Sequence, residues 1–362
     1  MRDMRALILS LLLSLSLSAA GQTWVIQSNN DSGAGSLRTA LDEANTLCGA
    51  PEVACSITFF DHPELIPQTI ELRTALPVVT ACNLTIRSQV RAAGLPDATW
   101  GIRPAFAIEL AEGLVLRPRC EASRITVDGL SVQSFNGDAV AVLGAAQATY
   151  TFNRLNLSGQ SRGLAVDAPK AAVALSNSTI GHTSRSSVTL WSAANSALTN
   201  VRLRNSGASG IFVGPNGGAL TVRNSLIHDH AQFGIAVARG NGSFVLDNTR
   251  IYNTAVMDID YGLDGPTDTA PLVTSAIYNE ARNLTIITVD PRHNGPARIE
   301  VWASLTLTMF GTAHLDRFIT SLDTNTGSVE IEAPGDLSRR FISALRVDGT
   351  RVSEVGGAVV VR

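Results

Sequence analysis

The sequence predicts an all-β fold whose middle part is a right-handed parallel β-helix. Three observations lead to this prediction. The middle of the chain repeats with a period of 23 to 25 residues, the repeats share apolar positions, and asparagine recurs at one place within them. Such repeats stack into a solenoid, because one repeat cannot bury its apolar face alone.

Six segments align, and each begins a repeat. They are ITVDGLSV from Ile125, YTFNRLNL from Tyr150, VALSNSTI from Val173, SALTNVRL from Ser196, LTVRNSLI from Leu220 and FVLDNTRI from Phe244. The third residue of every copy is apolar (Val127, Phe152, Leu175, Leu198, Val222 and Leu246), and so is the eighth (Val132, Leu157, Ile180, Leu203, Ile227 and Ile251).

A third apolar column follows about seven residues after the second, often directly after a glycine. Its members are Leu164, Val188, Ile211, Ile235 and Ile259. Because alternate side chains of a strand point to opposite faces, the three columns predict three short strands per repeat, each directing apolar residues inward. A leucine-rich repeat has a similar period, but it needs a helical segment, and these copies lack apolar residues at helical spacing.

The fifth residue is asparagine in four successive copies, namely Asn177, Asn200, Asn224 and Asn248. In coils stacked at about 4.8 Å, such amides can hydrogen-bond to one another along the solenoid. We therefore expect a structural asparagine ladder at a bend; a binding role for these residues is the alternative.

Residues 1–20 predict a secretory signal peptide. Two arginines precede an apolar run that ends at Leu17, and the small residues Ser18, Ala19 and Ala20 follow. The apolar run is too short to cross the roughly 30 Å core of a bilayer, and no later stretch is long and apolar enough to do so. The expected location is secreted or periplasmic, with no membrane span.

All four cysteines, Cys48, Cys55, Cys82 and Cys120, fall in the first third of the chain. Exported thiols usually pair, and pairing between sequence neighbours gives Cys48–Cys55 and Cys82–Cys120, although three connectivities are open. A zinc site is the alternative, but the spacing does not follow the usual pattern.

The composition gives no electrostatic reason to expect nucleic acid as a partner, since the formal net charge is -3. Lysine occurs only at position 170, which limits the choice of a catalytic amine. We expect a monomer that binds a polysaccharide or cell-surface glycan and needs no obligatory cofactor.

The segment NNDSGAGSLRTALDEAN, from Asn29 to Asn45, resembles the N-terminal cap of secreted bacterial right-handed parallel β-helix proteins with a DSGxGSLRxAI motif, similar to the CSLREA-domain proteins. The resemblance implies a helix over about Ser36–Leu47 that covers the open end of a pectate-lyase-like solenoid. Toward the C-terminus, ARIEVWAS from Ala297 and FISALRVDGTRVSEV from Phe341 resemble the immunoglobulin-like module that follows such solenoids.

The predicted organisation has four parts. They are a signal peptide over 1–20, a cap with the first coils over 21–124, the regular β-helix over 125–268 and an Ig-like β-sandwich over 269–362.

In polysaccharide lyases and glycosidases of this fold, the active cleft lies on an outer face. The best candidate column lies two residues beyond the eighth position, at His182, Asn205, Asp229 and Asn253, with Arg204, His228 and His230 beside it. In a cleft that acts on sugars, Asp229 would be the acid or a metal ligand, His228 or His230 the base and Arg204 the clamp for a carboxylate, while His182, Asn205 and Asn253 would bind ligand. The alternative is a solvated turn, because adjacent strand residues point to opposite faces.

Several observations argue against an enzyme. The NTD, DD, GHG and RIK motifs of polygalacturonase-like enzymes are missing, as is the RxPxxR signature of calcium-dependent pectate lyases. Hydrolysis of glycosides requires a pair of carboxyl groups, and the regular repeats hold few acidic residues beyond Asp229 and Asp247.

A second acidic group, Asp258, Asp260 and Asp264, lies at the junction with the C-terminal part. Calcium is the cofactor that such a group would hold, although the spacing is not that of an EF-hand; a polar end of the solenoid is the alternative.

Two functional classes remain. The first is an exported, non-catalytic protein for adhesion or polysaccharide binding, which the missing catalytic motifs favour. The second is a polysaccharide lyase or glycoside hydrolase with a cleft around Asp229.

Overall fold

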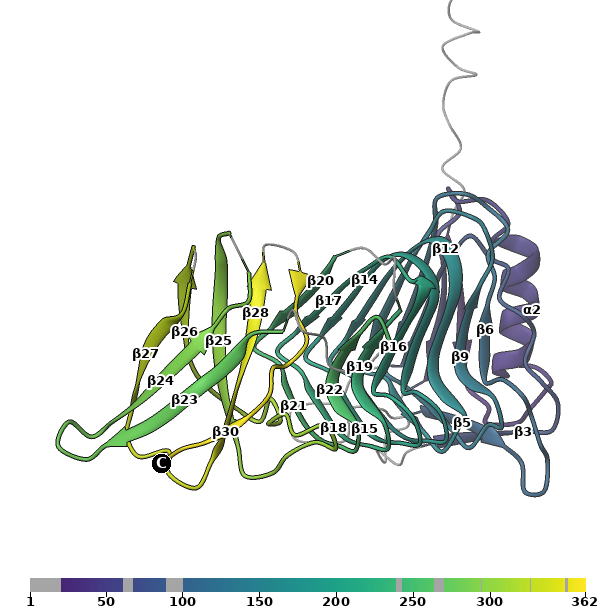
Figure 1. The fold of residues 1–362 in the computed structure, drawn as a ribbon. Helices are drawn as coiled ribbons and strands as arrows, with labels where there is room; N and C mark the ends of the chain where they lie inside the picture. The colour runs from purple at the N-terminus through teal and green to yellow at the C-terminus, as the bar shows by residue number, and fades with distance from the viewer. Residues whose placement is uncertain are drawn as a thin grey trace, which may run out of the picture.

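The computed structural model describes residues 21–60, 68–88, 100–238, 243–263, 270–293, 295–325, 327–348 and 351–362. The predicted signal peptide and Asp264 lie outside these residues. The described chain winds into a parallel β-solenoid that carries helix α2 at one end and a module of antiparallel strands at the other (Figure 1). None of the described helical segments has both the length and the apolar character needed to cross a membrane.

Each regular coil contributes one strand to each of three faces. The first face contains β1 (Gln22–Ile26), β2 (Cys55–Phe59), β4 (Asn83–Ser88), β7 (Ser123–Asp128), β10 (Ala148–Asn153), the ends of β12 (Arg162–Ser176) and β14 (Val188–Thr199), β17 (Ala219–Arg223) and β20 (Phe244–Asp247). The second contains β3 (Gln68–Leu72), β5 (Trp100–Pro104), β8 (Leu130–Gln133), β11 (Asn156–Ser158), β13 (Thr179–Thr183), β15 (Arg202–Ser206), β18 (Leu226–His230) and β21 (Arg250–Thr254).

The third face contains β6 (Leu114–Leu116), β9 (Asp138–Leu143), the starts of β12 and β14, β16 (Ile211–Asn216), β19 (Phe233–Val237) and β22 (Met257–Tyr261). Because β12 and β14 continue from the third face into the first face of the next coil, these two faces form one hydrogen-bonded sheet.

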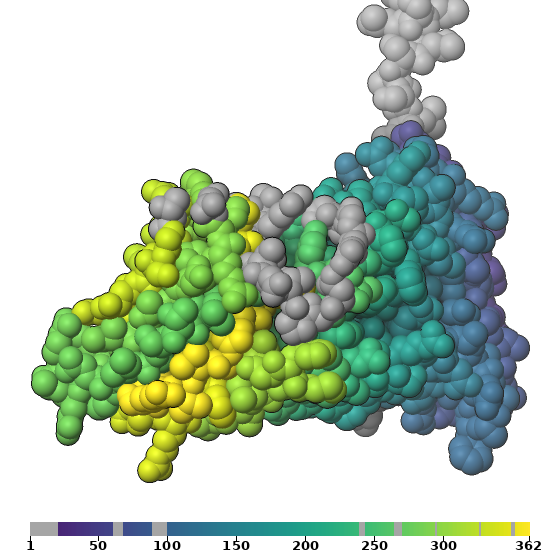
Figure 2. Space-filling view, viewed as in Figure 1, coloured from purple at the N-terminus to yellow at the C-terminus, as the bar shows by residue number. Residues whose placement is uncertain are grey.

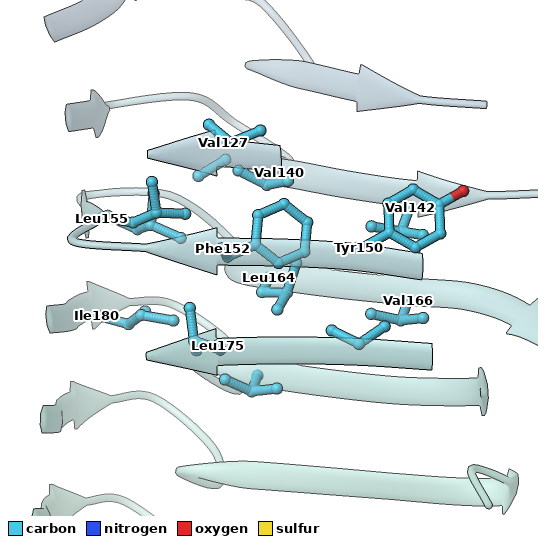
Figure 3. Packing of buried hydrophobic residues seen from close by; sticks show 14 of the residues in the cluster. Val127, Val140, Val142, Tyr150, Phe152, Leu155, Leu164, Val166, Leu175 and Ile180 are labelled. Carbon is cyan, nitrogen blue, oxygen red and sulfur yellow. The ribbon is translucent and has the colours of Figure 1, made fainter. Parts of the chain in front are cut away.

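The predicted apolar columns are confirmed by the strand registers. Val127 pairs with Phe152, which pairs with Leu175, and the series continues through Leu198. The other two columns align in the same way, for instance Ile180 with Leu203 and Leu164 with Val188. All these residues are buried, and Figure 3 shows five of them, Val127, Phe152, Leu164, Leu175 and Ile180, stacked between the faces. The repeat period therefore equals one coil.

The glycines that precede the third column allow a close approach between two faces. A Cβ atom added at Gly163, Gly210 or Gly234 would lie 2.2, 2.6 or 2.3 Å from the Cγ2 atom of Ile180, Ile227 or Ile251, respectively. Real Cβ atoms do not come so close, so a glycine here lets the isoleucine of the second face fill the corner.

Helix α2 (Leu37–Leu47) forms where the sequence predicts a helix. Ser36 caps it, because its side chain accepts a hydrogen bond from the Thr39 backbone N–H. Its apolar side, which includes Leu37, Leu41 and Ala44, is buried in the same core as the solenoid. The helix lies beside the first coils at the end of the molecule (Figure 1).

Both predicted disulfides are confirmed. Cys48 pairs with Cys55 at the end of α2, and Cys82 pairs with Cys120, which joins the segments just before β4 and β7. The bonds fasten the helix and the early coils, where the repeat is least regular.

The C-terminal module consists of two antiparallel sheets. One contains β23 (Leu272–Asn279), β24 (Leu284–Asp290) and β27 (Val329–Pro334); the other contains β26 (Arg317–Thr324), β25 (Ala297–Ser304), β28 (Phe341–Asp348), β29 (Arg351–Val352) and β30 (Val359–Val360). The two sheets enclose a common core that includes Ile287, Ile331, Val301 and Ile342. An immunoglobulin-like strand order for this module stays a prediction.

The module packs directly against the last coil, and the surfaces of the two parts meet in Figure 2. The backbone N–H of Ile251 donates to the Leu315 carbonyl at 2.8 Å, and Leu315, Leu345 and Val352 belong to the core of the solenoid. The apolar cross-section of the last coil is thereby covered.

Candidate functional site

The column His182, Asn205, Asp229 and Asn253 occupies equivalent positions of successive coils, at the bend between the second and third faces. All four residues are exposed and have a left-handed backbone conformation, with φ values of 55°, 53°, 61° and 53°. Asparagine and aspartate tolerate this conformation better than most residues, so the backbone alone favours them here. The side chain of Asn253 donates to Asp229 Oδ1 at 3.0 Å, which joins two members of the column.

His228 lies on the outer side of the second face, directly beside Asp229. Its Nδ1 atom is 2.6 Å from Asp229 Oδ2, and Arg202 Nε donates to its Nε2 atom at 3.2 Å. Because an arginine N–H can only donate, Nε2 accepts and the proton lies on Nδ1, which donates to Asp229. Both ring nitrogens are therefore engaged, and the imidazole links Arg202 to Asp229.

Asp229 is held in its ionised form. Partial burial raises the pKa of its carboxyl group, but the hydrogen bonds from Asn253 and His228 outweigh that effect and keep the pKa below its usual value. The Asp229 side chain is 41% exposed, whereas that of His228 is 6% exposed. Asp229 is consequently an accessible anion near neutral pH and is not set up as a proton donor.

His230 does not join His228 and Asp229 at the surface. The left-handed Asp229 reverses the alternation of the strand, so His230 points inward and is 2% exposed. Its Nδ1 atom lies 2.6 Å from the Ser206 hydroxyl, and Nε2 is buried beside Gly210. Burial lowers the pKa of His230 to about 4, so the imidazole is neutral over most of the physiological range.

Arg204 is one coil away from His228 in the same outward column. It pairs in register with His228, which pairs with Tyr252 of the next coil. Its stem lies across Gly181, where an added Cβ would be 2.9 Å from Arg204 Cγ. Arg204 is half-buried, and its Nε atom is buried without a hydrogen-bond partner among the described residues.

Tyr252 completes an aromatic and cationic row on the second face. Its ring stacks on that of His228, with centroids 5.0 Å apart and planes 10° apart. The guanidinium of Arg250 lies 5.5 Å from the Tyr252 ring centre and binds Asp316 of the C-terminal module at 2.5 Å. The C-terminal module thus fixes one end of the row.

A groove of about 520 Å³ adjoins this row at the bend between the first and second faces. It runs over the asparagine ladder, and its walls include Asn177, Asn200, Asn224, Arg202 and Leu226. Amide-to-amide hydrogen bonds join Asn177 to Asn153, Asn200 to Asn177 and Asn248 to Asn224, at 2.8, 2.7 and 2.8 Å. Arg202 belongs both to the groove and to the cluster around His228, so the two surfaces are continuous.

The sequence reasoning missed Arg202, which is the residue that joins the groove to the cluster. The available signal was its position two residues before Arg204, because residues i and i+2 of a strand share a face. Tyr252 was recognisable only as a scarce aromatic residue. Its contact with His228 depends on the register of β18 and β21.

Two residues of the acidic group at the junction, Asp258 and Asp260, are buried at the C-terminal end of the solenoid. Asp258 is fully buried; its oxygens accept from Thr254 Oγ1 and the Leu315 backbone N–H, each at 2.6 Å, and its Oδ1 lies 2.8 Å from His314 Nδ1. Asp260 is buried on the third face, in register with Ala236. Across the described residues, no three His, Cys, Asp or Glu side chains are grouped to hold a metal ion.

Comparison with known families identifies the solenoid. Residues 113–267 match a family model described as "Right handed beta helix region". The tailspike protein gp49 from Acinetobacter baumannii bacteriophage Fri1, a capsular polysaccharide depolymerase, is 8% identical, with a TM-score of 0.35 over 95% of this chain and 84% of that chain. Tailspike protein 2 from Escherichia coli O157:H7 bacteriophage CAB120 is 10% identical, with a TM-score of 0.23 over 83% of this chain and 57% of that chain.

No curated protein matches the chain. The two structural likenesses are too loose to bear on the site. The family match over residues 113–267 and the strand registers together support a right-handed β-helix in this part of the chain.

Proposed function

We propose that this protein is exported and binds polysaccharide, without cleaving it, along the second face of the β-helix. The supporting observation is Arg202, which lines the groove over the asparagine ladder and also contacts the row of Arg204, His228 and Tyr252. Coils at a regular spacing present the same kinds of groups again and again, which suits a polymeric ligand.

The chemistry of the row fits a sugar polymer that carries carboxylates. The guanidinium groups of Arg202 and Arg204 can donate paired hydrogen bonds to a carboxylate. Asp229 is an ionised acceptor for hydroxyl groups. The site therefore combines the donors and the acceptor that binding requires.

The engagement of the candidate catalytic groups argues for binding over cleavage. His228 has neither ring nitrogen free, His230 is buried, and Asp229 is ionised. A general base needs an open position on its reactive nitrogen, and a general acid needs a proton at the working pH. The alternative function, a lyase or hydrolase around Asp229, would require ligand binding to rearrange these contacts.

Export is supported by the disulfides Cys48–Cys55 and Cys82–Cys120, since such bonds persist mainly in oxidising compartments. The predicted signal peptide agrees with this location.

The test measures retention of the mature chain on a panel of acidic and neutral polysaccharides together with release of new reducing ends. We expect retention on an acidic polysaccharide, and a loss of at least about tenfold in affinity for Arg202→Gln and Arg204→Gln, because one charge-assisted hydrogen bond contributes roughly 1.5–3 kcal/mol. Arg223→Gln is the matched control, since Arg223 is an exposed arginine on the first face that pairs with Asp247 at 3.7 Å.

Unchanged retention in both arginine variants would refute the proposed face. Release of reducing ends that disappears in Asp229→Asn would replace the binding function with the enzymatic one.

A further inference from the structure

A second groove, of about 720 Å³, lies at the bend between the third and first faces, in the N-terminal half of the solenoid. Its walls include Arg117, Arg119, Lys170, Glu121 and Thr80. None of these residues belongs to the second face or to the groove over the asparagine ladder, so the two grooves lie at different bends of the coil.

The backbone that carries the two arginines is firmly anchored. Arg117 and Arg119 follow β6, and their N–H groups donate to the carbonyls of Val79 at 2.8 Å and Thr80 at 3.3 Å. The next residue, Cys120, is bonded to Cys82. The two side chains therefore project from a segment whose backbone is already ordered, so ligand binding loses no backbone conformational entropy there.

The groove concentrates positive charge on a chain whose net charge is -3. Arg117, Arg119 and Lys170 are exposed, and the guanidinium groups of both arginines have no hydrogen bond or ion pair with another described residue. Lys170 Nζ lies 4.0 Å from Glu121, whose other carboxylate oxygen accepts from the Gln147 backbone N–H. Three cations thus face one anion that is already engaged.

We propose that this groove is a separate binding site for an acidic polysaccharide, which it holds by the carboxylate groups of the sugars. Free guanidinium groups pair with planar carboxylates through two parallel hydrogen bonds, and Lys170 adds a point charge. The site stands independently of the proposed function, because it shares no residue with the second face.

Lys170 makes the groove directly observable, since it is the only lysine in the chain. Reductive methylation with ¹³C-formaldehyde keeps the charge and gives one lysine signal in an NMR spectrum, which the Lys170→Arg variant assigns by its loss. The probe is tetragalacturonate, with cellotetraose as the neutral control and inorganic phosphate as the arm for simple anions.

We expect tetragalacturonate to shift the Lys170 signal in a saturable way and cellotetraose to leave it in place. The Arg117→Gln/Arg119→Gln double variant should weaken binding at least about tenfold, which corresponds to about 1.4 kcal/mol. Added salt should weaken it as well, because the charges are exposed. The Arg202→Gln/Arg204→Gln variant is the control, and it should leave this titration unchanged even if the second face proves inactive.

Three results would overturn the proposal: no shift up to millimolar tetragalacturonate, the same affinity in the Arg117→Gln/Arg119→Gln variant, or an equal shift with phosphate at the same concentration. The last result would identify a general anion site without preference for sugar acids.

Discussion

The two bends that border the second face both require a left-handed backbone conformation, but their side chains have different roles. At the bend before the second face, Asn177, Asn200, Asn224 and Asn248 have φ values of 43° to 54°; at the bend after it, the column from His182 to Asn253 has values of 53° to 61°. The first column uses its amides to bond one coil to the next, whereas the described bonds of the second include only one such link, from Asn253 to Asp229. A repeated left-handed position can therefore stabilise the stack or display varied chemistry.

The largest expected effect concerns the residue that follows the second bend. The inward column there reads Thr183, Ser206, His230 and Thr254, so one imidazole replaces a hydroxyl group. The pKa of His230 is lowered to about 4, mainly by burial, from about 6.5 in the unfolded chain. Between these values the unfolded state binds more protons, so the free energy of unfolding should fall as the pH drops from 6.5 to 4, by roughly 3 kcal/mol in total.

Urea unfolding across that pH range checks this prediction against the His230→Thr variant, which restores the hydroxyl column. The variant should lose the contribution of His230 to the pH dependence. If both proteins lose stability equally over this window, His230 is not the group responsible.

The next effect breaks the ladder. Asn200→Val should lower the free energy of unfolding by about 2–3 kcal/mol, because a β-branched residue is strained in the left-handed region and the hydrogen bond to Asn177 is lost. Asn200→Gly should lower the free energy of unfolding by only about 1 kcal/mol, because glycine adopts the left-handed conformation without strain and only the hydrogen bond is lost. Denaturant unfolding of the two variants separates the two contributions.

The smallest effect is expected at the matching position of the other bend. Asn205→Gly should change the free energy of unfolding by less than about 0.5 kcal/mol, because this exposed residue meets only the backbone requirement. A loss as large as that of Asn200→Gly, measured in the same unfolding experiment, would show that both columns stabilise the stack and would remove the distinction between them.

The sequence determined the repeating part of the fold. Stacked coils bring equivalent positions into contact, so the apolar columns had to recur at one period and could be aligned without a structure. The helix over Ser36–Leu47 was implied only by the resemblance of its motif to a known cap, and the observed cysteine pairing was the preferred one of three open connectivities.

Only the tertiary structure decided which polar residues meet. Strict alternation would have placed His228 and His230 on one face and Asp229 on the other, but the positive φ of Asp229 brings His228 and Asp229 together and turns His230 inward. The groove that holds Arg117 and Lys170 draws residues from segments far apart in sequence, and Asp258 is fixed by His314 of the C-terminal module. Local patterns report which face a residue occupies, whereas such contacts depend on the register between coils and on single backbone reversals, which a period of apolar residues does not encode.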